Sequence, residues 1–267
     1  MIPLRDDQPI STFPIVTILL IAANVLIYVG QQFLPLEQVW ALVPYAVTHN
    51  IDLNGSFAHI GRDGVAHLVR LPPGGAVQLT ARDIPYGPSP HPVWLTIFTS
   101  MFLHGGLLHI GGNMLYLWIF GNNIEDVLGR VRFLLFYFAC GLAASAAQIA
   151  INPDSLIPNV GASGAIAGVL GAYFVLYPNA RVLSIVPVFF LGLLAEVRAF
   201  WVLLLWIVLN IFQGVLGLGM RTGGGVAHFA HIGGFFAGVL LILLLGGRSL
   251  AARQQRRATY PPPWAAS

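Results

Sequence analysis

The stretch NVGASGAIAGVLGAYF at residues 159–174 decides how this chain is interpreted. It is a run of small and apolar residues that contains one serine, Ser163, between Gly161 and Gly164, just after an Asn-Pro-rich turn. Small residues at regular spacing favour close packing of helices. A hydroxyl at the beginning of such a segment therefore needs an explanation of its own.

The composition of the chain indicates a membrane protein. Of its 267 residues, 57% are hydrophobic and 9% are charged, and the mean hydropathy is +0.77. A soluble domain has roughly 25% charged residues. All 13 cations are arginine, the net charge is only +3, and no basic patch favours nucleic acid. The single cysteine, Cys140, cannot form an internal disulfide and is expected to be a small buried apolar residue.

Six apolar segments approach or reach the ~20 residues that cross a bilayer core. They are 14–34, 106–121, 133–151, 162–177, 199–218 and 226–246. The first is too long for a cleaved signal peptide, and no small-residue cleavage site follows it. A seventh stretch, 182–195, is short and is interrupted by Pro187 and Gly192. We expect this stretch to lie at the membrane interface or in a loop.

Arginines in the short loops predict the orientation, because such residues accumulate on the cytoplasmic side. With six spans, one side receives nine arginines: Arg5, Arg130, Arg132, Arg181, Arg198, Arg248, Arg253, Arg256 and Arg257. The other side receives Arg62, Arg70, Arg82 and Arg221. We therefore expect a cytoplasmic segment 1–13, a six-helix membrane domain 14–247 with a long outer-side loop 35–93, and a cytoplasmic tail 248–267. The YPPPW sequence indicates that this whole tail is disordered.

Four polar side chains stand out within the spans: His109, Asn113, Ser163 and His231. Polar groups in a membrane span cost free energy, so each of them needs a reason. In the predicted orientation all three helices that carry them run inward from the outer face. The four side chains then lie at a similar shallow depth, and His109 and Asn113 share one helix face. The agreement in depth predicts one polar site near the outer surface.

Glycine spacing predicts which of these groups meet. Gly164, Gly168 and Gly171 form a smooth stripe beside Ser163, and Gly234 and Gly238 do the same near His231. Stripes of small residues let two membrane helices approach closely. Packing the two stripes together would bring Ser163 and His231 within hydrogen-bonding reach. A neighbouring imidazole that takes its proton makes a serine nucleophilic.

Donors for a negatively charged oxygen are also available at this depth. The backbone N–H of Ser163 is unpaired because the residue begins a helix, and Asn113 and His109 can donate from an amide and a ring nitrogen. Together they could hold the oxyanion of a tetrahedral intermediate. No carboxylate lies in the same layer of the spans. We therefore predict a Ser–His dyad, with Asp154 as the one acid in the outer loops that could join it.

These residues resemble the rhomboid intramembrane serine proteases. Four motifs occur in order: HGGLLHIGGN (104–113), GNNIEDVLG (121–129), GASG (161–164) and AHIGGFFAG (230–238). The nucleophile motif of the family falls on Gly161, Ser163 and Gly164, and its histidine motif on Ala230, His231, Gly234 and Gly238. The oxyanion His and Asn match His109 and Asn113. In the family, the glutamate that corresponds to Glu125 is structural.

The resemblance implies a six-helix bundle that cleaves transmembrane segments of other membrane proteins within the lipid bilayer. It implies no cofactor, no metal and no nucleic-acid partner, and a location in the inner or plasma membrane of a prokaryote. Many family members carry a tyrosine four residues after the serine that stacks on the catalytic histidine. Here that position is Ala167, so another group must hold the ring.

Other interpretations of these residues stay open. Ser163 could be a helix cap or a packing residue. His104, His109, His228 and His231 could bind a metal, although the chain has no H-E-x-x-H motif. His104 is expected to stabilise the loop before its helix, and His228 ranks second as the base.

A rhomboid-like protein that binds membrane clients without cutting them is the main alternative function. A transporter is less favoured, because neither inverted repeats nor membrane-embedded carboxylates are found. The substrate and the oligomeric state stay undetermined.

Overall fold

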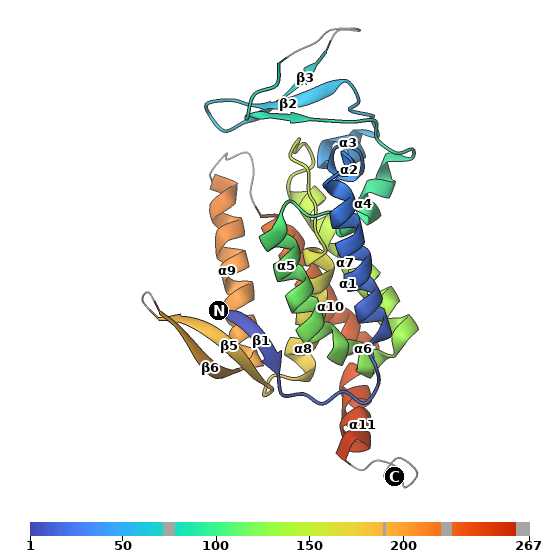
Figure 1. Ribbon diagram of the computed structural model, residues 1–267, viewed down its shortest axis with the longest axis vertical. Helices are drawn as coiled ribbons and strands as arrows, with labels where there is room; N and C mark the ends of the chain where they lie inside the picture. Colours follow the sequence, from blue (N-terminus) through green and yellow to red (C-terminus); the bar gives the residue numbers. More distant parts are fainter. Residues whose placement is uncertain (72–77, 189–190, 220–225, 260–267) are drawn as a thin grey trace.

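The computed structural model describes residues 1–71, 78–188, 191–219 and 226–259 (Figure 1). The predictions made for Arg221 and for the YPPPW sequence at 260–264 fall outside these residues. Most of the described chain is helical. A helical bundle forms the body of the molecule, and a small β-sheet lies at each of two places along it.

Each of the six predicted apolar segments forms a helix. These helices are α1 (Ile15–Gln31), α5 (Leu107–Tyr116), α7 (Arg130–Ile151), α8 (Ser163–Leu176), α9 (Ala199–Gly219) and α10 (His228–Leu244). The second segment is not uniform. Helix α5 continues through a π-helical turn, η3 (Leu117–Gly121), into α6 (Asn122–Leu128).

Length and hydropathy identify only some of these helices as membrane spans. In the described residues, α7 and α9 are long and apolar enough to cross a membrane. Two more spans result if bent pairs count as one: Val93–Phe102 with Leu107–Leu128, bent by 79°, and His228–Leu244 with Gly247–Gln254, bent by 73°. Helices α1 and α8 are apolar but shorter. The chain is thus a multi-pass membrane protein, and the number of six crossings remains a prediction.

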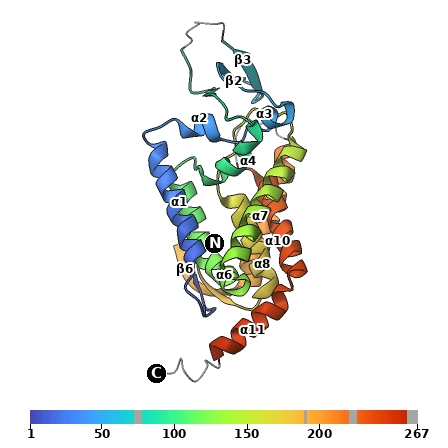
Figure 2. The same cartoon turned by 90° about the vertical axis from the view of Figure 1, so that its right-hand side faces the viewer.

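Helix α8 lies inside the bundle. Its residues from Gly164 to Tyr173 are all buried, and it packs against α7 and α10. Figure 2 shows α1 on one side of the bundle and α10 on the other. Because six of these ten residues are alanine or glycine, the neighbouring helices approach its backbone closely.

The predicted outer loop 35–93 is a folded segment. It contains α2 (Leu36–Trp40), α3 (Pro44–His49) and an antiparallel sheet of β2 (Ser56–Ile60), β3 (Ala66–Arg70) and β4 (Asp83–Pro85), in the order β3-β2-β4. Its apolar residues form a core of their own, which includes Leu53, Ala58 and Tyr86. Leu156, from the loop before α8, completes this core. Three short helices then lead to α5: η1 (Val93–Leu95), α4 (Thr96–Thr99) and η2 (Ser100–Phe102).

The stretch 182–195 forms a β-hairpin. Strands β5 (Arg181–Val188) and β6 (Leu191–Arg198) pair antiparallel, and β1 (Ile2–Asp6) pairs antiparallel with β5. This sheet lies at the end of α8 away from residues 35–93, which are called the outer segment below (Figure 1). The stretch was predicted to be an interfacial segment or a loop, and as a hairpin it does not form a helical span.

Acidic side chains of α6 hold together the segments that meet at this end of the bundle. The Glu125 carboxylate accepts the backbone N–H groups of Val16 at 2.9 Å and Thr17 at 2.7 Å, so it satisfies free donors at the start of α1. Asp126 accepts bonds from Ser11 and from Gln254 Nε2 at 2.6 Å. Glu125 therefore has a structural contact of the kind that the resemblance implies.

The tail differs from its prediction. Residues Gly247–Thr259 form helix α11, whereas the segment 248–267 was predicted to be disordered. Ala251 is buried, and Gln254 donates to Asp126 and to the Pro9 carbonyl at 3.1 Å. These contacts with the bundle and the N-terminal segment stabilise a helix that composition alone did not predict.

Asp6, at the end of β1, connects the N-terminal strand to α8. The Tyr173 hydroxyl and Asn123 Nδ2 both donate to its Oδ2, at 2.5 and 2.8 Å. Burial removes the carboxylate from water and raises the pKa of Asp6 from 3.8 to about 6. The folded protein therefore retains a proton that the unfolded chain loses at lower pH.

This difference predicts a pH effect on stability. As pH rises from about 4 to about 6, the unfolded chain loses the Asp6 proton first, so the contribution of this group to stability decreases and then levels off. We expect the melting temperature of the wild type to fall across this range relative to Asp6→Asn, which cannot titrate. Thermal melts of both proteins in detergent between pH 4 and pH 7 test this. Parallel curves would contradict it.

Candidate active site

Ser163 and His231 lie together in the bundle. Ser163 is the first residue of α8 and His231 lies in the first turn of α10, and the distance from Ser163 Oγ to His231 Nε2 is 2.8 Å. Both helices begin at the end of the bundle that carries the outer segment. A serine hydroxyl that faces an imidazole nitrogen at this distance can transfer its proton to that nitrogen.

Glycines allow α8 and α10 to approach this closely. A Cβ atom on Gly234 would collide with the Gly164 carbonyl, and one on Gly238 would collide with the Gly168 backbone. The two glycine stripes predicted from the sequence therefore face each other. Gly168 also faces α7, because a Cβ there would collide with Cys140.

The third group in contact with the histidine is Asn210 on α9. Its Oδ1 lies 2.7 Å from His231 Nδ1 and 3.1 Å from His228 Nδ1. The sequence analysis missed Asn210. The cost of an amide within the apolar segment 199–218 was a signal that could have identified it.

The ring that packs against His231 is that of Trp206 on α9. Its ring centroid lies 5.5 Å from that of His231, with the two planes tilted by 37°. The tryptophan comes from α9, whereas in the family the stacking residue follows the serine on its own helix. The group that packs against the imidazole is therefore on a different helix in this chain.

The structure also shows the surroundings of Asp154 and His228, which the sequence offered as alternative members of the site. The side chain of Asp154 is 78% exposed and lies 3.9 Å from His49 Nε2, in the outer segment, so it does not reach His231. In the described residues, no group of three or more His, Cys, Asp and Glu side chains is placed to hold a metal ion. His228 contacts Asn210, while His231 is the histidine that contacts Ser163.

His109 faces the same site from α5. Gly161, with φ +126°, adopts a conformation that other residues rarely take. A Cβ atom there would lie 2.8 Å from His109 Nε2 and 3.6 Å from Ser163 Oγ. Only a glycine therefore fits between the imidazole and the serine. The other ring nitrogen, His109 Nδ1, accepts the Gly105 N–H at 3.3 Å.

Asn113 lies one turn further along α5 and is 7% exposed. Its Nδ2 has no hydrogen-bond partner in the described part of the chain. A buried amide donor without a partner costs free energy, and such a group at a polar site is a common feature of a binding position.

His104 lies at the start of this region and is buried. Its backbone N–H donates to Gln31 Oε1 at 3.0 Å, and Gln31 Nε2 donates to its carbonyl at 3.2 Å. Its ring packs edge-on against His109, with centroids 5.1 Å apart. His104 thus fits the predicted role at the junction between the loop and the helix.

The outer segment holds the loop that leads to Ser163. Leu42 and Asn159 exchange two backbone hydrogen bonds, of 3.1 and 2.7 Å, and the Tyr86 hydroxyl donates to the Leu156 carbonyl. The Gly161 N–H donates to the Ser100 carbonyl at 2.9 Å. The position of the serine therefore depends on segments far away in the sequence.

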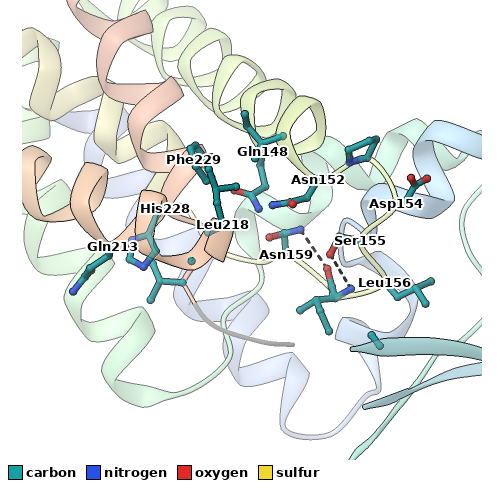
Figure 3. A pocket seen from close by; sticks show the side chains of 18 of the residues that line it. Gln148, Asn152, Asp154, Ser155, Leu156, Asn159, Gln213, Leu218, His228 and Phe229 are labelled. Atoms are coloured by element: carbon teal, nitrogen blue, oxygen red, sulfur yellow. Dashed lines mark hydrogen bonds between the residues drawn. The ribbon is translucent and has the colours of Figure 1, made fainter. Parts of the chain in front are cut away.

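A wide pocket opens next to this loop (Figure 3). Its volume is about 880 Å³, and its walls come from the ends of α7, α9 and α10, from the loop 152–159 and from the turn between β2 and β3. A small cavity of about 40 Å³ reaches Ser163 and shares Gln148, Asn159 and Ala227 with the wide pocket. Polar side chains such as Asn152, Asp154 and Gln213 line the wide pocket.

Comparison with known proteins shows the family of this chain. Residues 91–248, more than half of the chain, match the model of the Rhomboid domain. The chain is similar to rhomboid protease GluP of Bacillus subtilis, 43% identical over 30% of this chain and 15% of that protein. It is also similar to the mitochondrial Rhomboid protein 1 of Saccharomyces cerevisiae, 34% identical over 55% of this chain and 40% of that protein.

A third relative is the putative rhomboid protease YdcA of Bacillus subtilis, 35% identical over 32% of this chain and 44% of that protein. The matched regions thus cover less than half of each of these three relatives. The relatives come from a bacterium and from a mitochondrion, and others are plant proteins, one of them chloroplastic. The domain match covers the helices that carry Ser163, His109, Asn113 and His231, and the chain belongs to the rhomboid family.

Proposed function

We propose that this protein is an intramembrane serine protease that cleaves transmembrane segments of other membrane proteins. The observation that carries the proposal is the 2.8 Å contact between Ser163 Oγ and His231 Nε2 inside a bundle of apolar helices. The wide pocket shares lining residues with the small cavity that reaches Ser163, which would give water and an unwound peptide access to the serine.

The proposed reaction begins with the hydroxyl of Ser163. As Oγ attacks the carbonyl carbon of the scissile bond, His231 Nε2 takes the hydroxyl proton, and the carbonyl oxygen becomes an oxyanion. When the tetrahedral intermediate collapses, the C–N bond breaks and His231 gives the proton to the leaving amine. Water, deprotonated by His231, then hydrolyses the acyl-enzyme and restores the serine.

Three donors would hold the oxyanion. They are His109, Asn113 and the backbone N–H of Ser163, which is free because Ser163 begins α8. In the described residues Asn113 Nδ2 has no partner, and His109 Nε2 and Ser163 Oγ both lie beside Gly161; both observations support this assignment. No cofactor or metal takes part in the proposed reaction.

The donors give a testable expectation. If Asn113 stabilises charge only in the transition state, Asn113→Ala lowers kcat by roughly 10²–10³ with little change in KM. His109→Ala has a comparable effect, and the double variant is less than additive if both donors share one oxygen. Turnover and melting temperature are measured on the same preparation. Near-normal turnover with a lowered melting temperature would exclude Asn113 from the oxyanion site.

We also propose that all six apolar helices cross the membrane, with both termini in the cytoplasm. The arginine distribution supports this orientation, and the position of the hairpin 182–195 beside β1 fits it. We propose the inner or plasma membrane of a prokaryote as the location, to which the bacterial relatives correspond.

Reporter fusions test the orientation. A reporter fused after Gly247 is expected to be active on the cytoplasmic side, because six crossings separate it from the N-terminus. A reporter inserted within 55–71 is expected on the outer side, because a single crossing separates it from the N-terminus. An outer-side signal from the fusion after Gly247 would contradict the proposed topology.

The function itself is tested with purified protein in liposomes and a model transmembrane substrate. We expect two fragments cut near the outer end of the substrate helix, together with labelling of Ser163 by a fluorophosphonate. A client-binding protein without protease activity would co-purify with the substrate but give neither fragments nor label. That result would replace the proposed function by the binding function.

A further inference from the structure

We infer that Asn210 is a positioning residue that holds the imidazole of His231 in the tautomer and orientation that the reaction needs. The inference rests on the proposed function and adds a third member to the Ser–His pair. This third residue has an amide side chain, and it lies on α9 rather than on the helices that carry Ser163 and His231.

The hydrogen bonds of Asn210 determine which way its amide points. Its Nδ2 donates to the Trp206 carbonyl at 2.9 Å. Since a carbonyl oxygen can only accept, the NH₂ group must face Trp206, and the amide oxygen must face the histidines. Oδ1 is thus an acceptor 2.7 Å from His231 Nδ1.

This acceptor selects one tautomer of His231. A hydrogen bond between two acceptors is impossible, so Nδ1 of His231 must carry the proton in the neutral ring. The other nitrogen, Nε2, then has a free lone pair, and this lone pair lies 2.8 Å from the Ser163 hydroxyl. Asn210 therefore leaves His231 ready to accept the serine proton.

The position of Asn210 favours a specific role over an incidental contact. The residue is 7% exposed in a helix of high hydropathy, where an unpaired amide would be costly. Both ends of its amide are hydrogen-bonded. Its oxygen accepts from His228 as well, at 3.1 Å, which uses its second lone pair. The side chain is thereby fixed in one orientation.

Trp206 and Asn210 restrain the ring in complementary ways. The indole of Trp206, one turn before Asn210 on α9, packs against the imidazole of His231. The hydrogen bond from His231 Nδ1 to Asn210 Oδ1 limits rotation of the imidazole about its Cβ–Cγ bond. In serine and cysteine proteases with a third residue, a carboxylate or an amide oxygen at Nδ1 has this function. Here both restraints come from one helix.

Kinetics of Asn210 variants test the inference. Asn210→Leu has a similar size and no acceptor, and we expect kcat to fall roughly 10- to 100-fold while KM stays unchanged. Asn210→Asp keeps an oxygen opposite Nδ1 and is expected to recover most of kcat. The matched control is Gln32→Leu at the end of α1, which removes an exposed amide that, like Asn210, donates to the carbonyl four residues earlier, here that of Tyr28 at 3.1 Å. Gln32 lines neither of the two described pockets, and this variant is expected to retain wild-type kcat.

A pH profile of Asn210→Asp keeps the inference testable if Asn210→Leu does not fold. A carboxylate next to Nδ1 favours the protonated ring, so the acidic limb of the kcat profile moves to higher pH. The other titratable groups near His231 in the described chain are His228 on α10 and His109 on α5, and both are unchanged in this variant. The serine on α8 and the remaining α9 residues around the ring carry no charge.

The possible results separate a failure of the role of Asn210 from a failure of the proposed protease function. Wild-type cleavage with a normal kcat in Asn210→Leu, or an unshifted profile in Asn210→Asp, overturns the role of Asn210 and leaves the proposed protease function intact. A wild-type protein that neither cleaves the substrate nor takes the fluorophosphonate label overturns both. Loss of kcat in Asn210→Leu with recovery in Asn210→Asp supports the role.

Discussion

Replacement of Ser163 or His231 by alanine is expected to reduce cleavage of a transmembrane substrate by about 10⁶-fold, below detection in most assays. Either change removes one half of the proton-transfer pair, since Ser163 Oγ and His231 Nε2 face each other at 2.8 Å. Because the pair acts as a unit, the double variant should be scarcely slower than either single one. Fragment yield is followed over time in liposomes, with the melting temperature as the check on folding.

The matched control for His231→Ala is His228→Ala. His228 lies one turn earlier on α10 and contacts the same Asn210 oxygen, but it is His231 that contacts Ser163. We expect His228→Ala to retain cleavage within about tenfold of the wild type, a change the size of one lost hydrogen bond. Cleavage that persists in His231→Ala and disappears in His228→Ala would transfer the role of base to His228.

Replacement of Gly234 by alanine is expected to slow cleavage strongly by moving α10 away from α8. The added Cβ would collide with the Gly164 carbonyl, which belongs to the backbone next to Ser163, so α10 must move away from α8. A displacement of about 1 Å at reacting groups can cost roughly 100-fold in rate. We therefore expect a loss of this size in kcat and a lower melting temperature, although no reacting group is changed.

Gly112→Ala is the control for this experiment. Gly112 is also a helical glycine, and a Cβ there would have no neighbour within 4 Å in the described structure. Alanine is favoured over glycine within a helix by about 1 kcal/mol, so this variant should melt at the same or a higher temperature. Equal melting temperatures and activities for Gly234→Ala and the wild type would contradict the close contact between α8 and α10.

Hydropathy and spacing were sufficient to predict the helices and the meeting of Ser163 with His231. The helices follow from long apolar runs, and the contact follows from Gly168, Gly234 and Gly238, which let α8 and α10 pack closely. Motifs contributed by single helices were thus accessible from the sequence.

Features that depend on distant parts of the chain were not predictable in the same way. The hairpin of β5 and β6 has the composition of any short apolar run, and its pairing with β1 joins residues about 180 positions apart. The sheet in the outer segment and α11 are stabilised by contacts such as those of Leu156 and Gln254, which composition does not reveal. Asn210 and Trp206 act on His231 from another helix, and no local motif marks them.

The order of the site along the chain has a consequence for biosynthesis. Ser163 is in α8, Asn210 in α9 and His231 in α10, so a ribosome completes the nucleophile well before the base. Helix α10 fits between α7 and α8, where Cβ atoms on Gly233 and Gly234 would collide with Ala147 and with the Gly164 backbone. In the proposed mechanism, the growing chain therefore carries an unactivated serine until α10 enters this groove, and a nascent or truncated chain would not cleave its neighbours.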